Sequence, residues 1–495
     1  MSQGKRESED QREFWLPTDR LATGPGHVFY DKLNCLLAEN GFDLFVEQLC
    51  QPHYKTGGRP SIPPGVYFRM LMIGYLEGID SQRGIAWRCE DSLALRRFLR
   101  ISLSEDTPDH SSLTRIRDRL PLSVHEEVFQ YILYVIETHG LLKAQTVGVD
   151  STFLEANAAM KTIIRKDTGE DWKAYLKRLM REDGLLKEDD DDPTDDELRR
   201  FDKQRMKQGK KKVSNDEWIS GTDPSSRIVK MKDGRTHLGY KAEHVVDLES
   251  EVIVSATVYS GTDGDAQTLL ASVVAAQIHL DQCGSALEIE EVAADKGYHA
   301  NETLANCKEL DLRAYIPEPK SRYPRRWTDK PPEYQRAVVN NRRRMSRAKG
   351  KGLQRQRSEK VERSFAHVCE TGGARRTWLK GLDKINKRYL IVTAARNLGL
   401  LMLRLFGIGK PRTLQADGDG FLSVFSRLNV LLGLLWRAQK RGWPSSVVFS
   451  ASVPRLAMTF RVRENWSPRR PSLLFQQAAS SLALSTALGS FMRSY

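Results

Sequence analysis

Residues 147–150 read VGVD and residues 292–295 read VAAD, so a short apolar run ends twice in an aspartate. Apolar runs of this length are typical of buried strands. An acid at the end of such a strand lies at the rim of the sheet, where loops meet and a ligand can approach. We therefore expect Asp150 and Asp295 to lie side by side on neighbouring strands.

A third acid, Glu362, lies in the segment VERSF at residues 361–365, inside a strongly basic region. Val361, Phe365 and Val368 follow the i, i+4, i+7 spacing of a packed helical stripe, which places Glu362 at the border of that stripe. We expect this helix to pack on the rim of the sheet and to bring its acid to the two aspartates.

Three converging carboxylates would supply the hard oxygen ligands that Mg²⁺ prefers, with Mn²⁺ as the alternative. The six cysteines contain no CxxC pair, so neither a zinc ribbon nor a disulfide framework is indicated. We expect two ions held by Asp150, Asp295 and Glu362, an arrangement that suits phosphodiester chemistry on DNA. Each acid alone is a weaker signal, because Asp150 could cap a turn and Glu362 could pair with an arginine.

Positive charge is concentrated between residues 320 and 363, where sixteen cations face four acids. The whole chain has 495 residues and a net charge of +13, so double-stranded DNA is the expected partner. We expect phosphate contacts from the arginines of this segment, namely Arg342, Arg343, Arg344, Arg355, Arg357 and Arg363.

The region 29–142 carries helical signals only. Residues 64–76 have the spacing of a half-buried helix, and a second helix is expected over residues 85–99. The turn TPDHSS at residues 107–112 precedes a helix over Leu113–Leu120 that carries three candidate DNA contacts, Arg115, Arg117 and Arg119. A helix-turn-helix DNA reader fits this pattern, and ordinary helix packing with a solvated basic face fits almost as well.

These signals divide the chain into a flexible N-terminus (1–28), a helical DNA-binding domain (29–142), an α/β catalytic domain (143–408) and a tail of unknown role (409–495). A charged insertion at about residues 165–225 interrupts the catalytic domain, and we expect it to be solvated and mobile. No signal peptide or full-length apolar span is visible, so we expect a cytoplasmic protein with no membrane partner.

The motifs resemble those of the DDE transposases of bacterial insertion sequences, which have a ribonuclease H-like catalytic domain. The resemblance rests on VGVDST (147–152), GYK (239–241), ADKGY (294–298), VERSF (361–365) and AARNL (394–398). The segment PDHS before the arginine-bearing helix resembles the N-terminal domain of that family. The implied fold is α/β, a ribonuclease H-like mixed sheet flanked by helices and preceded by an all-helical N-terminal domain.

By this resemblance Asp150, Asp295 and Glu362 are the catalytic triad and the metal ligands, with Tyr298 and His367 as auxiliary residues. The resemblance also implies a nucleoid-associated enzyme that binds terminal inverted repeats, cleaves DNA and transfers the strands to target DNA. Because two DNA ends must be brought together, it implies a homodimer or a larger synaptic complex.

The sequence departs from the family around the glutamate. Related transposases often carry a tyrosine and an arginine before it and a lysine seven residues after it. Here Ser358 stands four residues before Glu362 and Cys369 seven residues after it, so Arg355, Arg357 or His367 would have to substitute.

Two further alternatives remain open. Glu359 competes as the third acid, but its exposed basic surroundings and the VERSF match favour Glu362. The chain could also be a structure-specific nuclease of the same fold, or an inactive relative that only binds DNA.

Overall fold

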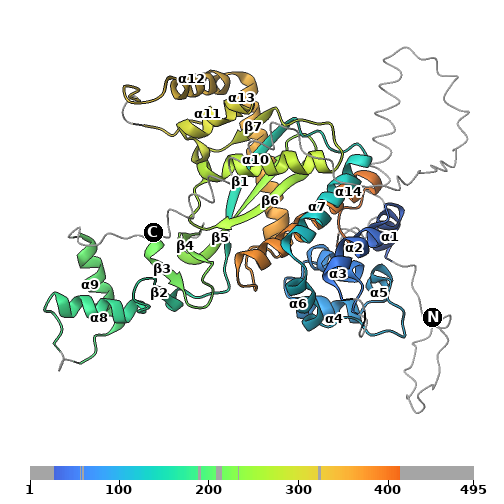
Figure 1. The fold of residues 1–495 in the computed structure, drawn as a ribbon, viewed down its shortest axis with the longest axis horizontal. Helices are drawn as coiled ribbons and strands as arrows, with labels where there is room; N and C mark the ends of the chain where they lie inside the picture. Colours follow the sequence, from blue (N-terminus) through green and yellow to red (C-terminus); the bar gives the residue numbers. More distant parts are fainter. Residues whose placement is uncertain are drawn as a thin grey trace, which may run out of the picture.

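The computed structural model describes residues 27–412, apart from residues 56, 58–60, 188–190, 208–214, 232–233 and 322–324. The N-terminal region is helical, and its helices gather on one side of the sheet (Figure 1). These helices are α1 (Val28–Glu39), α2 (Phe42–Cys50), α3 (Pro64–Glu77), α4 (Gln82–Glu90), α5 (Leu93–Leu99), α6 (His110–Arg119) and α7 (Leu122–Thr138).

Two expectations about these helices are wrong. Helix α3 is buried on all sides from Gly65 to Leu76, not half-buried, because it packs between α2, α4 and α5 and the long C-terminal helix α14 (Leu382–Phe406). The helix expected over residues 85–99 is two helices, because Ser92 accepts a hydrogen bond from Leu95 N (3.3 Å) and caps a new one.

The region after α7 contains a mixed sheet in the order β4-β5-β1-β7-β8, with β6 also paired to β5. Strand β5 is antiparallel to β1, whereas β7 is parallel to β1 and β8 is parallel to β7. Its strands are β1 (Thr146–Glu155), β4 (Arg227–Lys230), β5 (Thr236–Asp247), β6 (Ile253–Ser260), β7 (Glu291–Ala294) and β8 (Arg313–Tyr315). The expected α/β fold with a mixed sheet and flanking helices is confirmed.

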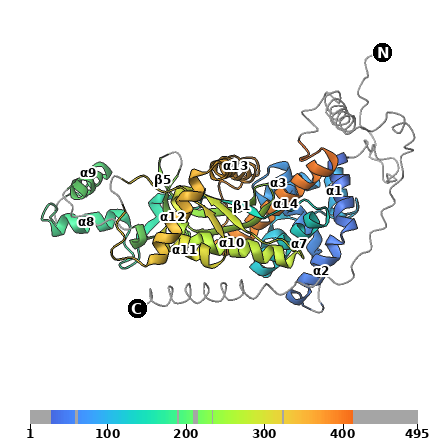
Figure 2. The ribbon, with the colours of Figure 1, turned by 90° about the horizontal axis from the view of Figure 1, so that it is seen from above.

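The two faces of the sheet are covered by different helices. Helix α13 (Ala348–Phe365) lies on one side of β1, and α10 (Asp265–Gln282) lies on the other side with α11 (Asn301–Glu309) beside it (Figure 2). Helix α12 (Pro332–Ser346) packs against α11 and leads into α13. Successive residues of β1 therefore face α13 and α10 in turn, because strand side chains alternate between the two faces.

The charged insertion contains helices and strands that the sequence analysis does not predict. It contains the helices α8 (Trp172–Glu182) and α9 (Asp195–Lys207) and the short paired strands β2 (Ile163–Arg165) and β3 (Trp218–Ser220). The two helices form a small core of their own from Leu176, Leu179, Leu198 and Phe201. They lie at the opposite end of the molecule from the N-terminal helices (Figure 1).

One hydrophobic core runs from Phe29 in α1 to Met402 in α14, so the N-terminal helices and the sheet are packed together. Helix α14 joins them, because it packs against α3, α7 and β6. Within the described residues it is the one helix long and apolar enough to cross a membrane, but 72% of its most apolar window is buried inside the protein. It is the core helix of this fold. Residues 413–495, which hold nearly all of the expected tail, lie outside the described residues.

Candidate active site

The two aspartates lie side by side, as the sequence predicts. Strands β1 and β7 are parallel and in register, with Val149 paired to Ala294, and the next residue on each chain is the acid. Asp295 follows the last residue of β7, and its Oδ1 accepts a hydrogen bond from Gly297 N at 2.6 Å. Asp150, by contrast, is not at the end of its strand, because β1 continues to Glu155 along the longer β5. It stands beside the point where β7 ends.

The carboxylate of Asp150 is largely buried, with 21% of its side chain exposed. Its Oδ1 accepts a hydrogen bond from Ser151 N (2.8 Å), and its Oδ2 accepts one from Arg357 Nη1 (2.6 Å). Burial raises the pKa of Asp150 to about 6 although Arg357 acts in the opposite direction, and the nearby charges of Asp295 and Asp265 raise it further. Burial therefore has a larger effect on the pKa of Asp150 than its ion pair with Arg357.

Helix α13 is held against β1 at Gly148. A Cβ atom on this glycine would lie 2.7 Å from Leu248 Cδ2 and 2.8 Å from Val361 Cγ2, so only glycine permits the observed approach. Farther along the helix, the Phe365 ring stacks on His244 with the centroids 4.0 Å apart. Because His244 pairs with Asp150 across β1 and β5, the helix crosses the sheet at the level of the acids.

Glu362 lies on this helix, five residues after Arg357, and its side chain is exposed. On the opposite flank of the helix, Lys360 and Arg363 reach the turn between β5 and β6. The side chain of Glu362 makes no hydrogen bond or ion pair with any described residue. Among these residues no group of three acids, histidines or cysteines is close enough to hold one metal ion. The structure thus brings Asp150 and Asp295 together and leaves Glu362 outside their immediate contact.

The competing acid Glu359 has a different environment. Its Oε1 accepts a hydrogen bond from Arg363 Nη2 at 2.5 Å on the exposed side of α13, and Arg363 also pairs with Glu251. Because Glu359 is neutralised there, Glu362 is the acid of this helix that is available for another cation.

The auxiliary residues of the prediction are set back from the acids. Tyr298 is buried and donates a hydrogen bond to Glu243 Oε2 at 2.9 Å. His367 is half-buried in the π-helical turn Ala366–Thr371 that follows α13, and burial lowers its pKa. Cys369 is buried as well. Arg357 is the residue near the glutamate that contacts the site, through Asp150.

The predicted DNA-contacting arginines fall into three groups. Arg115, Arg119, Arg343 and Arg355 are exposed. Arg342 and Arg363 are paired with Glu318 and with Glu251 and Glu359. Arg344, Arg357 and Arg117 point into the protein: Arg344 donates to Ala314 O, Arg357 pairs with Asp150, and Arg117 is 5% exposed.

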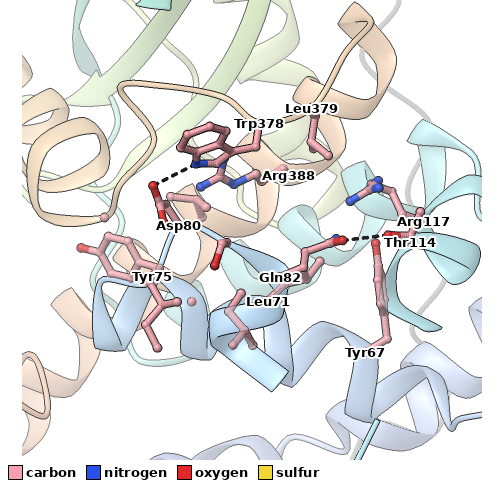
Figure 3. A pocket seen from close by; sticks show the side chains of 16 residues that line it. Tyr67, Leu71, Tyr75, Asp80, Gln82, Thr114, Arg117, Trp378, Leu379 and Arg388 are labelled. Carbon is pink, nitrogen blue, oxygen red and sulfur yellow. Dashed lines mark hydrogen bonds between the residues drawn. The ribbon is translucent and has the colours of Figure 1, made fainter. Parts of the chain in front are cut away.

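Arg117 lines a cavity of about 320 Å³ between α3, α4, α6 and α14 (Figure 3). Arg388 and Trp378 lie on another wall of this cavity, and Trp378 Nε1 donates a hydrogen bond to Asp80 Oδ2 at 3.0 Å. Because Arg117 faces this cavity and not the outer surface, we remove it from the residues that contact DNA.

The mixed sheet, with neighbouring acids on β1 and β7 and a third acid on the helix that crosses them, defines a ribonuclease H-like α/β protein. Comparison with protein families then gives two matches. Residues 19–119 match the family model described as Transposase domain (DUF772), and residues 192–398 match the Transposase DDE domain. The chain belongs to the DDE transposases of insertion sequences. Neither a curated protein nor a solved structure gives a significant match.

The DDE match includes Asp295 and Glu362 but begins after Asp150. The position of Asp150 in the site therefore rests on the register of β1 with β7 and on the ion pair with Arg357.

Proposed function

We propose that this transposase binds the terminal inverted repeats of its own insertion sequence, cleaves DNA there to free 3′-hydroxyls, and joins them to target DNA with Mg²⁺ or Mn²⁺ as cofactor. The observation that carries the proposal is that Asp150 and Asp295 directly follow the paired residues Val149 and Ala294 where β7 ends, near the helix that bears Glu362. It would act on chromosomal DNA in the nucleoid.

The residues present fit a hard divalent cation. The donors are carboxylates, the pKa of Asp150 is raised by burial and by two neighbouring acids, and a guanidinium already occupies one of its oxygens. We propose that Asp150, Asp295 and Glu362 hold two ions. When bound, such ions activate a water or a 3′-hydroxyl and stabilise the leaving oxygen of an in-line displacement.

Side chains of the protein would neutralise the free site and hold the DNA. Arg357 fixes and neutralises Asp150 in the free enzyme. The exposed Arg343 and Arg355, on α12 and α13, would hold phosphates beside the acids, and Arg115 and Arg119 on α6 would contact the inverted repeats. We propose that two copies of the chain bring the two ends together as a homodimer or a larger synaptic complex.

The test is a cleavage and strand-transfer assay with Mg²⁺ on DNA that carries the inverted repeats flanking this gene. The wild-type protein should give joined products, and the Asp295→Asn and Glu362→Gln proteins should give none. Glu359→Gln is the matched control, because Glu359 lies on the same helix and is engaged by Arg363.

Three outcomes decide the assignment. Joined products that disappear with Asp295→Asn support a transposase. Cleavage without joining indicates a nuclease of the same fold. DNA binding without any metal-dependent product from the wild-type protein indicates a relative that only binds DNA, and would overturn the proposal.

A further inference from the structure

A fourth acid, Asp265, lies beside the candidate active site. The N-cap of α10 is Gly264, and Asp265 is the first residue of the helix. Acids are common in the first turn, where they interact with the helix dipole. An interaction with the helix dipole does not explain the contacts that Asp265 makes with two strands of the sheet.

One oxygen of Asp265 is fixed from two strands. Its Oδ1 accepts a hydrogen bond from Ser151 Oγ (3.0 Å), on β1 next to Asp150, and another from Lys241 Nζ (3.3 Å) on β5. Because Ser151 and Lys241 face α10, these bonds tie the carboxylate to the side of the sheet opposite α13.

Lys241 is an unusual donor, since its side chain is 2% exposed. Its ammonium also donates to Thr268 Oγ1 (2.8 Å) and lies 3.7 Å from Glu243 Oε2, whose side chain is fully buried. Tyr298 OH and Thr268 Oγ1 donate to that same Glu243 oxygen. Buried charges are costly unless they are held in a complete network, and such networks fix the orientation of their members.

The second oxygen of Asp265 and the carboxylate of Asp295 both lie close to Gly297. A Cβ atom on Gly297 would lie 2.7 Å from Asp265 Oδ2 and 2.9 Å from Asp295 Oδ1, so the two carboxylates flank this glycine. No described residue donates a hydrogen bond to Asp265 Oδ2. The hydrogen bonds to Oδ1 therefore leave Oδ2 of Asp265 without a donor from the described part of the chain, across Gly297 from Asp295.

We propose that Asp265 is a fourth carboxylate of the metal site, in which Ser151 and Lys241 hold Oδ1 so that Oδ2 helps to bind the divalent ion next to Asp295. This inference rests on the proposed function. Tyr298 gains a role within it, because its hydroxyl donates to the Glu243 oxygen that lies 3.7 Å from the Lys241 ammonium.

Metal binding can be measured without turnover, by titrating the full-length protein with Mn²⁺ at pH 7.5 and counting free Mn²⁺ by electron paramagnetic resonance. We expect Asp265→Asn to raise the dissociation constant by about tenfold or more, the range typical for groups that support a metal site. The matched control is Asp263→Asn, because Asp263 lies in the same turn and accepts a hydrogen bond from Ser260 N instead. Its dissociation constant should stay within about twofold of wild type.

The Asp295→Asn protein distinguishes a failure of the fourth-carboxylate proposal from a failure of the proposed metal-dependent function. If Asp295→Asn weakens Mn²⁺ binding and Asp265→Asn does not, the fourth-carboxylate proposal fails and the proposed function stands. If neither variant weakens binding, the metal-dependent function fails as well.

If circular dichroism shows that Asp265→Asn is misfolded, a second variant still tests the proposal. Ser151→Ala removes only the hydroxyl that orients Oδ1 and should weaken Mn²⁺ binding by a few fold. Wild-type Mn²⁺ affinity in a folded Ser151→Ala protein would overturn the proposal.

Discussion

Replacing Gly148 by alanine tests whether the packing of α13 on β1 positions the active site. The new methyl group would lie 2.7 Å from Leu248 Cδ2 and 2.8 Å from Val361 Cγ2, whereas carbon atoms in contact are about 3.5–4.0 Å apart. To relieve these two close contacts, the methyl group and its neighbours must move apart by about 1 Å. The Leu248 side chain can rotate, but Val361 is stiff at χ1 and moves with α13.

This movement has two expected consequences. Overpacking of this kind costs about 1–3 kcal/mol of stability. A displacement of about 1 Å at a reacting group lowers the rate by about a hundredfold, and here it would displace Glu362, the neighbour of Val361. We expect Gly148→Ala to lower the unfolding temperature modestly and the single-turnover cleavage rate by about two orders of magnitude.

The matched control is Gly352→Ala on α13, where nothing lies within 4 Å of the added methyl group. That change should leave the cleavage rate unaltered and raise stability by up to about 1 kcal/mol, because alanine is the better helix former. The double variant Gly148→Ala, Val361→Ala should recover part of the lost rate. A Gly148→Ala protein that cleaves at the wild-type rate would refute the claim that this contact positions the site.

Three further predictions concern the acids. Arg357→Met removes the guanidinium that competes for Asp150, so Mn²⁺ should bind several fold more tightly in a titration, while the metal-free protein should lose stability in thermal unfolding. Because protonated Asp150 cannot hold a cation and its pKa is raised to about 6, Mn²⁺ affinity should be nearly constant above pH 7 and about tenfold lower at pH 5; equal affinities at the two pH values would contradict this. Glu362→Gln should abolish cleavage and Glu359→Gln should not, and the reverse result would move the third acid to Glu359.

The sequence predicted the central strands and their neighbouring acids, because apolar runs that end in an acid have few structural interpretations. It did not predict the length of β1. A charged residue inside a sheet is unfavourable unless it is paired, and the partner of Asp150 is Arg357, which lies 207 residues away in the chain. Single-sequence reasoning cannot identify a partner at that separation, so the strand was expected to stop at the acid.

The arginines show a second limit of prediction from the sequence. Helical spacing indicates which residues share a face, but a basic residue that points inward looks the same in the sequence as one that points outward. Arg117 faces inward because α6 packs beneath α14, where Lys387 Nζ donates to its backbone carbonyl (3.4 Å). Asp265 was missed for a related reason. An acid at the start of a helix is usually explained by its interaction with the helix dipole, so it does not stand out in the sequence. The buried Lys241 that pairs with Asp265 lies on β5, in a different part of the chain.

Helix α13 links the occupancy of the metal site to the geometry of the sheet. Arg357 and Val361 are one turn apart on the face that contacts β1, and Glu362 directly follows Val361. A divalent ion at Asp150 would compete with Arg357 for the oxygen that the guanidinium now occupies. Since that ion pair and the Gly148 contact hold the same stretch of the helix, displacement of the guanidinium would loosen α13 against β1 at this point. The stacking of Phe365 on His244 would still hold the helix farther along. Metal binding at Asp150 would therefore alter the position of the helix segment that carries Glu362.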